Sequence, residues 1–561
     1  MLLTTDGKTV YVNPQSLEDI SFLKTFPGFY KNTFPADRNV GRNLVQRLLS
    51  RKINFSFTPE VKNVINQKVS EDLPVDFKFH TEPLPFQRLA LQKAVSRNNV
   101  GFLLDPGLGK TKVALDWLFL KKAKRIIVVC PSPLKEVWVE QIQLHRPEFV
   151  PYIIETTVLT RELEAAGDKT FLICSYRTAS EGAGFLANWG PDSLIVDEAL
   201  IKNPSSLRTR SLTQLSQAES IQYRAILSGT LINNDAAEVF APVRLLERSL
   251  FGISNTVFNK EYFVFSRGET KFPVGLKKGV EEELREVLRS VSIIMRKEQY
   301  LSSLPPKHIF PIFVEISDVQ QSLISQIREQ REFSLPGKKP VIVKSQLTAL
   351  GKLLQIENYF YYEPTDEEDV TLEDLFLSGE NHRKARRLLE PIVLTSAADA
   401  PKPKRFRELS HQLGGKRGII WFNFRAELPL ILASLDDRYL VVDGNTKSPS
   451  KIVTQFNQDP NIRWLVAQAR VLNYGVTVLG EELSEDEILP DFSGEVHVEI
   501  FFSVNFSYEV LVQQMDRIHR IGQKFPCEYY FLLADSVGER RVWEILQQKQ
   551  NVREYMLASC L

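Results

Sequence analysis

The stretch Gly101–Ala114 reads GFLLDPGLGKTKVA: an apolar run, a glycine-rich turn and then the start of a helical pattern. Phosphate binding needs this order, because bare backbone N–H groups surround a phosphate, a lysine reaches the outer phosphates and a helix N-terminus adds partial positive charge. The strict pattern also wants a glycine at position 104, where this chain has leucine. We predict a phosphate-binding loop at Asp105–Lys112, with a chance glycine turn as the alternative.

Segments on both sides of this loop alternate between two patterns, and the alternation predicts the fold class. Apolar runs of strand length, separated by helical patterns, occur at 101–104, 125–130, 170–174, 193–196 and 224–227, then again at 418–422, 439–442, 463–467, 496–502 and 527–533. Short buried strands spaced by helices indicate parallel sheets covered on both faces. The predicted fold class is α/β, with two doubly wound parallel-sheet lobes.

The length of 561 residues fits a chain of several parts. We predict a small N-terminal accessory domain at 1–80, a first lobe at 81–310, a helical insertion or linker at 311–410 and a second lobe at 411–561. Proline and glycine punctuate the third part, as in Leu335–Pro340 and Pro401–Lys404, which is typical of linkers around helices.

The overall charge is close to zero, with 70 Lys and Arg against 69 Asp and Glu. Nucleic-acid binders usually carry a basic excess, so this balance at first argues against that class. However, residues 363–380 and 481–499 each hold eight acidic residues and no Lys or Arg. With those sixteen set aside, 70 basic residues face 53 acidic ones. We interpret the two segments as solvated acidic loops, with gating of a DNA path or binding of a partner as alternatives.

Simple patterns exclude several other classes of protein. No apolar run approaches the roughly 18–20 residues of a membrane helix, and the N-terminal sequence turns polar too early for a secretory signal. The four cysteines are far apart and form no Cys-x-x-Cys pair, so neither a zinc site nor a disulfide framework is predicted. We expect no membrane partner and a reducing, intracellular compartment.

An acidic motif accompanies the phosphate loop. Leu194–Ala199 is an apolar strand pattern that ends in Asp197 and Glu198. In a phosphate-loop enzyme the first acid of such a pair holds Mg²⁺, and the second polarises the attacking water. Two acids that merely cap a turn are the alternative.

A third motif lies in the second lobe, where Gln513–Gln523 reads QQMDRIHRIGQ. If this segment is helical, Arg517 and Arg520 lie three residues apart on one face, with Gln513 one turn away. Two such arginines suit the charge that develops on a transferring phosphoryl group. Solvated or salt-bridged arginines are the alternative.

Across about residues 84–545 the sequence resembles the helicase-like ATPases of superfamily two, and within them the Swi/Snf-type DNA translocases. The most specific match is Asp197–Pro204, DEALIKNP, whose trailing Ile-Lys-Asn-Pro is typical of the subfamily. QQMDRIHRIGQ resembles the arginine-finger motif almost letter for letter. Further matches are Leu84–Gln87, Val129–Leu134 followed by Trp138, Cys174–Tyr176, Leu227–Asn234, Leu304–Lys307, Asp443-Gly444 and Gly475.

The resemblance implies ATP and Mg²⁺ as cofactors and a role for individual residues. The implied catalytic residues are Lys110, Asp197, Glu198, Arg517 and Arg520, and the implied Mg²⁺ ligands are Thr111 and Asp197. The implied nucleotide contacts are Gln87, Asp105, Pro106, Gly107, Leu108, Gly109, Lys110, Thr111, Lys112, Gly475 and Gln513. The implied DNA contacts are Ser132, Tyr176, Lys202, Asn203 and Trp421, and the implied coupling residues are Ser228, Gly229 and Thr230.

The chain departs from the family's pattern at three places. Leu200 stands where His or Gln is usual, Leu231 stands where Pro is usual, and Ala467-Gln468-Ala469 replaces a hydroxyl-containing stretch. These changes bear on coupling more than on hydrolysis, because the implied catalytic residues are all present. A non-hydrolytic DNA-binding scaffold with a decayed ATPase core is the alternative from another class.

The N-terminal segment Leu17–Leu49 resembles the substrate-recognition domain of the annealing-helicase (HARP-like) branch, which acts on forks and branched DNA; a packing domain is the alternative. We expect a DNA-dependent ATPase that translocates on double-stranded DNA and remodels forks or branches, with a strand-separating helicase as the alternative. Expected partners are double-stranded or branched DNA, bound through its phosphate backbone without sequence specificity, and replication or recombination proteins. We expect a monomer in the cytoplasm of a bacterium or a phage-infected cell, with a nuclear location as the alternative.

Overall fold

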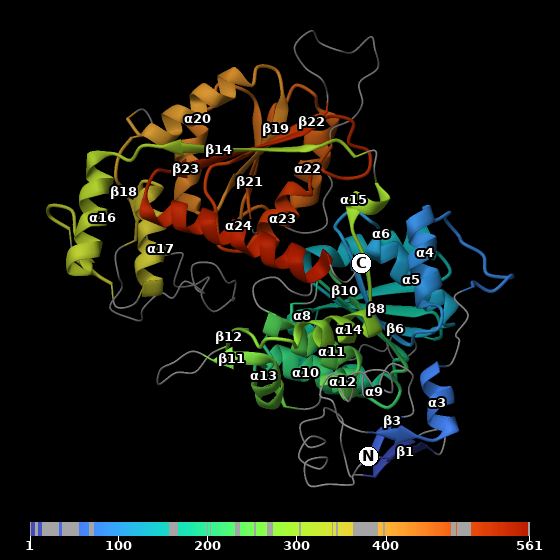
Figure 1. The fold of residues 1–561 in the computed structure, drawn as a ribbon. Coiled ribbons are helices and arrows are strands. Elements are labelled where there is room, and N and C mark those ends of the chain that lie inside the picture. The colour runs from blue at the N-terminus through green and yellow to red at the C-terminus, as the bar shows by residue number, and fades with distance from the viewer. Residues whose placement is uncertain are drawn as a thin grey trace. The chain divides into compact units, whose positions relative to one another are not determined.

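The structure, a computed structural model, describes residues 2–5, 9–13, 33–35, 55–66, 72–155, 167–198, 200–201, 203–229, 236–251, 254–265, 273–301, 304–338, 340–343, 346–362, 391–396, 399–469, 471–472, 478–479 and 495–558. The chain divides into two compact units, Met1–Ser302 with Val552–Leu561, and Ser303–Asn551. Each unit holds one parallel sheet with helices on both faces (Figure 1). The predicted α/β class with two parallel-sheet lobes is therefore confirmed.

The first unit is built on a seven-stranded parallel sheet of order β13-β5-β10-β9-β6-β8-β7. Its strands are β5 (Asn99–Leu104), β6 (Arg125–Cys130), β7 (Val150–Ile154), β8 (Thr170–Ser175), β9 (Ser193–Asp197), β10 (Tyr223–Leu227) and β13 (Ser292–Met295). Five of them coincide with predicted runs. The two that sequence reasoning missed, β7 and β13, are the edge strands, which need fewer apolar residues than central ones.

Helices cover both faces of this sheet (Figure 1). One face carries α4 (Pro85–Ala94), α5 (Lys110–Leu120) and α6 (Lys135–His145), and the other carries α8 (Tyr176–Glu181), α10 (Leu207–Ser216), α11 (Phe240–Leu246) and α14 (Glu281–Val291). The unit also contains α9 (Ala183–Asn188), α12 (Arg248–Phe251), α13 (Asn255–Tyr262), α15 (Lys297–Tyr300) and the hairpin of β11 (Phe263–Phe265) and β12 (Pro273–Leu276).

The described part of residues 1–80 holds a small sheet of its own, of order β3-β2-β1-β4. Its elements are β1 (Leu2–Thr5), β2 (Thr9–Asn13), β3 (Thr33–Pro35), β4 (Ser56–Phe57) and helix α3 (Pro59–Asn66). Apart from residues 33–35, the segment Leu17–Leu49 lies outside the described residues. Its resemblance to a DNA-structure-recognition domain therefore stays a prediction.

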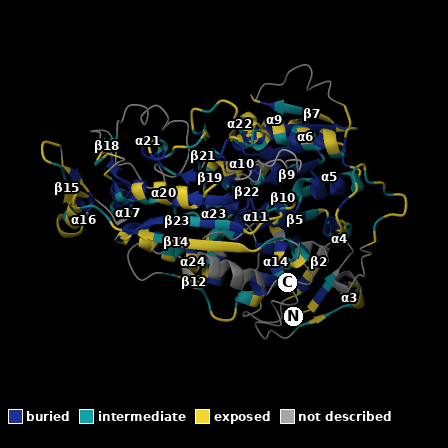
Figure 2. Ribbon diagram, turned by 90° about the horizontal axis from the view of Figure 1, so that it is seen from above, coloured by how far each residue is buried: buried dark blue, intermediate teal, exposed yellow. Residues whose placement is uncertain are grey.

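The second unit is built on a six-stranded parallel sheet of order β14-β23-β22-β19-β21-β20. Its strands are β14 (Lys307–Val314), β19 (Arg417–Phe422), β20 (Tyr439–Val442), β21 (Trp464–Gln468), β22 (Val496–Phe501) and β23 (Cys527–Ala534). β14, at the edge, was not predicted. Most of its residues are exposed (Figure 2), so it lacks the buried apolar run that marks the other strands.

The side chains of each central strand in this unit alternate between two cores. Ile419 and Trp421 of β19 pack on α22 (Pro449–Gln458), α23 (Tyr508–Met515) and α24 (Val537–Ala558). Ile420 and Phe422 face α20 (Pro401–Gln412) and α21 (Leu428–Leu432). This alternation follows from the two-residue period of a strand, and it buries apolar side chains on both faces of the sheet.

A small helical subdomain follows β14. It contains α16 (Asp318–Gln330), α17 (Gln346–Glu357) and two short hairpins, β15 (Glu332–Phe333) with β16 (Val341–Ile342) and β17 (Phe360–Tyr361) with β18 (Ile392–Val393). Residues 363–380 lie outside the described residues. The second acidic segment is partly corrected, because Glu499 is fully buried inside β22 and is not part of a solvated loop. No helix in the described part of the chain is long and apolar enough to cross a membrane.

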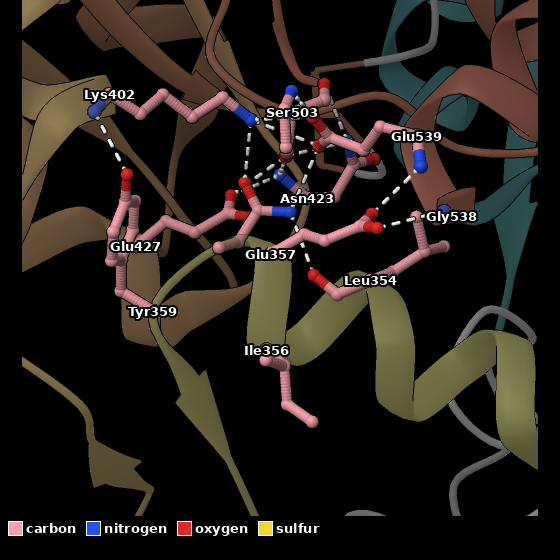
Figure 3. Close-up of polar contacts among 12 residues, drawn as sticks. Leu354, Ile356, Glu357, Tyr359, Lys402, Asn423, Glu427, Ser503, Gly538 and Glu539 are labelled. Atoms are coloured by element: carbon pink, nitrogen blue, oxygen red, sulfur yellow. Dashed lines mark hydrogen bonds and ion pairs between the residues drawn. The ribbon is translucent and has the colours of Figure 1, made fainter. Parts of the chain in front are cut away.

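Buried charged residues join the carboxyl end of the second sheet to its helices (Figure 3). The Glu357 carboxylate, at the end of α17, accepts hydrogen bonds from the backbone N–H groups of Gly538 and Glu539 at 2.8 and 2.7 Å, and so caps α24. Lys402 of α20 donates to both carboxylate oxygens of Glu539 at 2.9 Å. All these side chains are buried. Removing one partner of such a pair typically costs about 3–5 kcal/mol, because the other charge is left uncompensated.

Glu427 is a further buried carboxyl group of this region (Figure 3). Its Oε2 accepts hydrogen bonds from the backbone of Asn423 and Phe424, at 3.0 and 3.2 Å, and from the Ser503 hydroxyl at 2.8 Å. Within the described residues, Oε1 has no hydrogen-bond partner. Burial raises the pKa of Glu427 to about 7, although the charge of Lys402 opposes the shift. A proton on Oε1 is consistent with this geometry.

We predict that Glu427→Gln flattens the pH dependence of stability of the second unit. The folded pKa of about 7 exceeds the ordinary 4.5. The folded protein therefore keeps a proton that the unfolded chain has already released, so the stability contribution is complete below pH 4.5 and is lost as the pH rises through 7. The loss is on the order of 2–3 kcal/mol. Amide-exchange protection of β19 and β22 at pH 5 and pH 8 measures it.

The exposed Glu408→Gln is the matched control for this substitution, because it also removes one carboxylate. Wild type and the control should lose protection of β19 and β22 to the same extent at pH 8 relative to pH 5. Glu427→Gln should lose less, and its remaining loss comes from Glu357, whose pKa burial also raises to about 7. An equal loss in all three proteins would contradict the assignment.

Candidate active site

The glycine-rich loop between β5 and α5 has the backbone that a phosphate-binding loop requires. Gly107 and Gly109 have φ of +88° and +75°, in the left-handed region that favours glycine. A Cβ at Gly109 would also lie 2.3 Å from Nε2 of Gln87, so no other residue fits without displacing that glutamine. The next residue, Lys110, starts α5, and the loop therefore leads straight into a helix N-terminus.

Two anchors fix this loop to the rest of the lobe. Asp105, which is buried, accepts a hydrogen bond from the backbone of Lys297 at 3.0 Å, and its own N–H donates to Met295 at 3.1 Å. Gln87 accepts from the backbone of Leu84 at 3.0 Å and donates to the Leu108 carbonyl at 3.1 Å. Asp105 and Gln87 thus shape the loop. Pro106 and Leu108 complete it, with Leu108 fully buried.

The residues that follow the loop have different surroundings. Lys110 is half-buried and donates to the Leu104 carbonyl at 3.3 Å, and Thr111 is half-buried beside it. The side chain of Lys112 is used within the lobe, so the nucleotide contact predicted for this residue would have to come from its backbone. Its ammonium forms a buried ion pair with Asp116 at 2.6 Å, one helical turn along α5, and Arg146 bonds the other carboxylate oxygen.

Asp197 ends β9 inside the lobe, where its carboxylate is held by two donors. Trp138 of α6 donates its indole N–H to Oδ2 at 2.9 Å, and the backbone of Glu198 donates to Oδ1 at 2.9 Å. Burial raises the pKa of Asp197, while the Trp138 hydrogen bond and the positive charge of Lys110 lower it. The acidic motif and the phosphate loop are therefore electrostatic neighbours within one lobe. Trp138 is a positioning residue that the local sequence pattern did not predict.

The turn after Asp197 has a strained backbone, and hydrogen bonds to the Tyr176 hydroxyl hold it in place. Glu198 has φ of +57°, an uncommon conformation for a residue with a side chain. The Tyr176 hydroxyl donates to the Asp197 carbonyl at 2.6 Å and accepts from the backbone of Leu200 at 3.1 Å. The ring of Tyr176 is buried and its hydroxyl is used in this turn, and the DNA contact of this residue stays a prediction.

The predicted coupling residues lie against the phosphate loop. Ser228 is buried and its N–H donates to the Phe102 carbonyl of β5 at 3.2 Å. A Cβ at Gly229 would lie 3.0 Å from the Pro106 ring, so the two loops approach as closely as glycine allows. Thr230 lies outside the described residues. A movement of the phosphate loop would therefore displace Gly229 directly.

The remaining predicted DNA contacts differ in their exposure to solvent. Ser132 and Asn203 are exposed, after β6 and β9 respectively, and the Asn203 side chain accepts from the Ser205 backbone at 2.9 Å. Lys202 lies outside the described residues. Trp421 is fully buried between β19 and its covering helices, which excludes the predicted contact of its ring with DNA.

The arginine motif of the second unit is not a helix as predicted. α23 ends at Met515, and Arg517 and Arg520 follow in a series of turns, so helical spacing does not set their directions. The Gln523 amide holds these turns by donating to the carbonyls of Val496 and Ile518 at 2.9 and 3.1 Å. Burial lowers the pKa of Arg520, and the charge of Asp516 opposes that shift.

A second motif of the same unit supports the arginine segment. Lys307 forms an ion pair with Asp516 at 3.3 Å, and Nε2 of His519 donates to the Pro305 carbonyl at 3.0 Å. The motif Leu304–Lys307 therefore contacts the arginine segment, which lies about 210 positions later in the chain. Gln513 is buried, and Gly475 lies outside the described residues.

The residues of the first lobe fit a nucleoside triphosphate with Mg²⁺. A glycine-rich loop that leads into a helix, a lysine at the helix start, a hydroxyl at Thr111 and an acid at Asp197 are the groups that such a ligand requires. The hydrogen bonds and glycine contacts described above place all of them at the carboxyl edge of one sheet, where α/β folds bind their ligands.

Comparison with known proteins gives distant matches that cover most of this chain. The human protein "DNA annealing helicase and endonuclease ZRANB3" is 23% identical over 517 residues, which cover 89% of this chain and 42% of that protein. The Xenopus tropicalis "SWI/SNF-related matrix-associated actin-dependent regulator of chromatin subfamily A-like protein 1" is 23% identical over 538 residues, 93% and 50% of the two chains. The chain thus spans half or less of the length of these relatives.

Among solved structures, the "Sulfolobus solfataricus SWI2/SNF2 ATPase core in complex with dsDNA" is similar at 17% identity with a TM-score of 0.37, covering 87% of this chain and 95% of that one. The SNF2-related domain matches residues 45–361, more than half of the sequence. With the phosphate loop, the acidic turn and the arginine segment in place, the chain belongs to the SNF2-related family of helicase-like ATPases of superfamily two.

Proposed function

We propose that this protein is a DNA-dependent ATPase that translocates on double-stranded DNA and remodels forks or branched DNA. The observation that carries the proposal is the placing of the half-buried Lys110 and Glu198 beside the buried Asp197, with Gly229 of the coupling segment packed against the phosphate loop. The annealing activity named for the human relative supports the fork or branch as substrate.

The residues of the first lobe divide the chemistry of hydrolysis among them. When bound, ATP supplies the phosphoryl group and Mg²⁺, held by Thr111 and Asp197, neutralises charge on its phosphates. Lys110 reaches toward the outer phosphates, and Glu198 orients the attacking water and accepts its proton. The family resemblance assigns Arg517 and Arg520 the stabilisation of charge on the phosphoryl group in transfer.

Coupling to DNA follows from the contact of two loops. A shift of the phosphate loop moves Pro106 against Gly229, and a glycine with no free space cannot absorb that movement. The displacement therefore passes into the segment that follows β10. Contacts to phosphates at residues such as Ser132 and Asn203 make the resulting motion independent of base sequence.

We predict that Lys110→Ala lowers DNA-stimulated phosphate release by at least about 100-fold, because the charge that faces the outer phosphates is lost. Phosphate release measured with single-stranded, duplex and forked DNA tests this, with Lys124→Ala as control. Lys124 forms only an exposed ion pair with Asp168, so its variant should retain activity. Hydrolysis that DNA does not stimulate in wild type, or that Lys110→Ala leaves intact, would refute the proposed function.

We predict that Trp138→Phe lowers the rate about 10–100-fold at limiting Mg²⁺ and raises the Mg²⁺ concentration needed for half-maximal rate, because Asp197 loses a positioning donor. Trp189→Phe is the matched control, since the buried indole N–H of Trp189 has no hydrogen-bond partner among the described residues. If both variants show the same Mg²⁺ dependence as wild type, Trp138 does not position Asp197.

A further inference from the structure

A basic groove lies on the first unit, between α10 and α11. Its volume is about 390 Å³, and its lining includes Arg210, Thr213 and Gln214 from α10, Gln217 directly after α10, Arg244 from α11 and Arg248 from α12. The two walls belong to helices that cover the face of the sheet opposite α5 (Figure 1), so the groove is separate from the phosphate loop.

Helical spacing explains why these side chains share one groove. Arg210 and Gln214 lie four residues apart on one face of α10, and Gln217 follows at the end of that helix. Arg244 and Arg248 lie four residues apart on the opposite wall. Each wall therefore presents a row of donors, and guanidinium and amide groups bind phosphate oxygens well.

The charges of this groove are not compensated from within the protein. None of the residues that line it is acidic. In the described part of the chain, no carboxylate forms an ion pair with Arg210, Arg244 or Arg248. Nε of Arg244 is buried without a hydrogen-bond partner there, and burial together with the charge of Arg248 lowers the pKa of Arg244. Converging cations without a counter-charge are unfavourable unless an anion joins them.

One end of the groove reaches the catalytic edge of the lobe. Pro204 lines it and lies seven positions after Asp197, in the segment that follows β9. A chain of negative charges in the groove would therefore run from the loop after the acidic motif along two helices. Cations one helical turn apart on one wall, with a third on the other wall, suit a ligand with regularly repeated charges better than a single small ion.

We propose that this groove binds the phosphate backbone of DNA, as a contact additional to those at the carboxyl edge of the sheet. The inference rests on the proposed function and deepens it: a second phosphate-binding surface on the motor lobe lets one protein hold an additional DNA arm at a fork. Arg244 supplies the half-buried charge, and Arg210 and Arg248 supply the exposed charges on each side of it.

The test measures DNA binding of the full chain by fluorescence anisotropy over a salt series. The double variant Arg244→Gln with Arg248→Gln should weaken binding of forked DNA about 10-fold or more and reduce the slope of log affinity against log salt by nearly 2, since each lost phosphate contact lowers the slope by about 0.9. Arg210→Gln, on the opposite and exposed wall, should reduce the slope by about 1. Phosphate release at saturating linear duplex should stay within twofold of wild type.

Arg208→Gln is the matched control, because Arg208 lies on the same helix and carries the same charge but does not line the groove. An unchanged slope in the groove variants, or an equal decrease in Arg208→Gln, overturns the proposal. Competition by 10 mM inorganic phosphate at constant ionic strength that abolishes the difference between wild type and variant would assign the groove to a small anion and also overturn it. Wild-type hydrolysis that DNA does not stimulate would instead refute the proposed function itself.

Discussion

The buried carboxylate of Asp197 is the constraint on which the first lobe's site depends. Burial favours its protonated form, and only an ionised acid can hold a cation. Three elements counter this: the Trp138 indole of α6, the Glu198 backbone and the charge of Lys110 at the start of α5. The relative position of β9, α5 and α6 is therefore fixed by electrostatics as well as by packing. The strained φ of Glu198 is tolerated because the Tyr176 hydroxyl bonds both sides of the turn.

Close approach of backbones explains the glycines of two separate motifs. Gly109 leaves room for the Gln87 amide, and Gly229 leaves room for the Pro106 ring. Both contacts involve the same loop, so the Leu84–Gln87 motif, the phosphate loop and the coupling motif form one packed unit. In the second unit, the stretch Ala467-Gln468-Ala469, which departs from the family's pattern, also joins two loops. The Gln468 side chain donates to the Asn423 carbonyl at 3.2 Å and accepts from the Gly444 N–H at 3.1 Å.

Sequence patterns predicted the strands and loops that a short stretch of sequence specifies. They did not predict contacts between residues far apart in the chain. Central strands and the phosphate loop are apparent from short apolar runs and glycines. Trp138 lies 59 positions from its partner Asp197, so no local pattern shows that it orients the acid. The Tyr176 hydroxyl likewise bonds the carbonyl of Asp197, 21 positions away, which no local pattern shows. The arginine segment follows helical spacing in sequence, but bonds from Gln523 and Tyr529 stabilise turns there.

Net charge proved less informative than whether each charge has a partner. Lys112 and Arg146 are buried, yet both bond Asp116, so their charges are satisfied within the lobe. Lys402 and Glu539 form an equivalent buried pair in the second unit. The arginines of the α10–α11 groove differ, because neither a carboxylate nor a carbonyl of the described residues bonds them. The half-buried charge of Arg244 costs desolvation free energy without a counter-charge, so a ligand that brings negative charge would stabilise the groove.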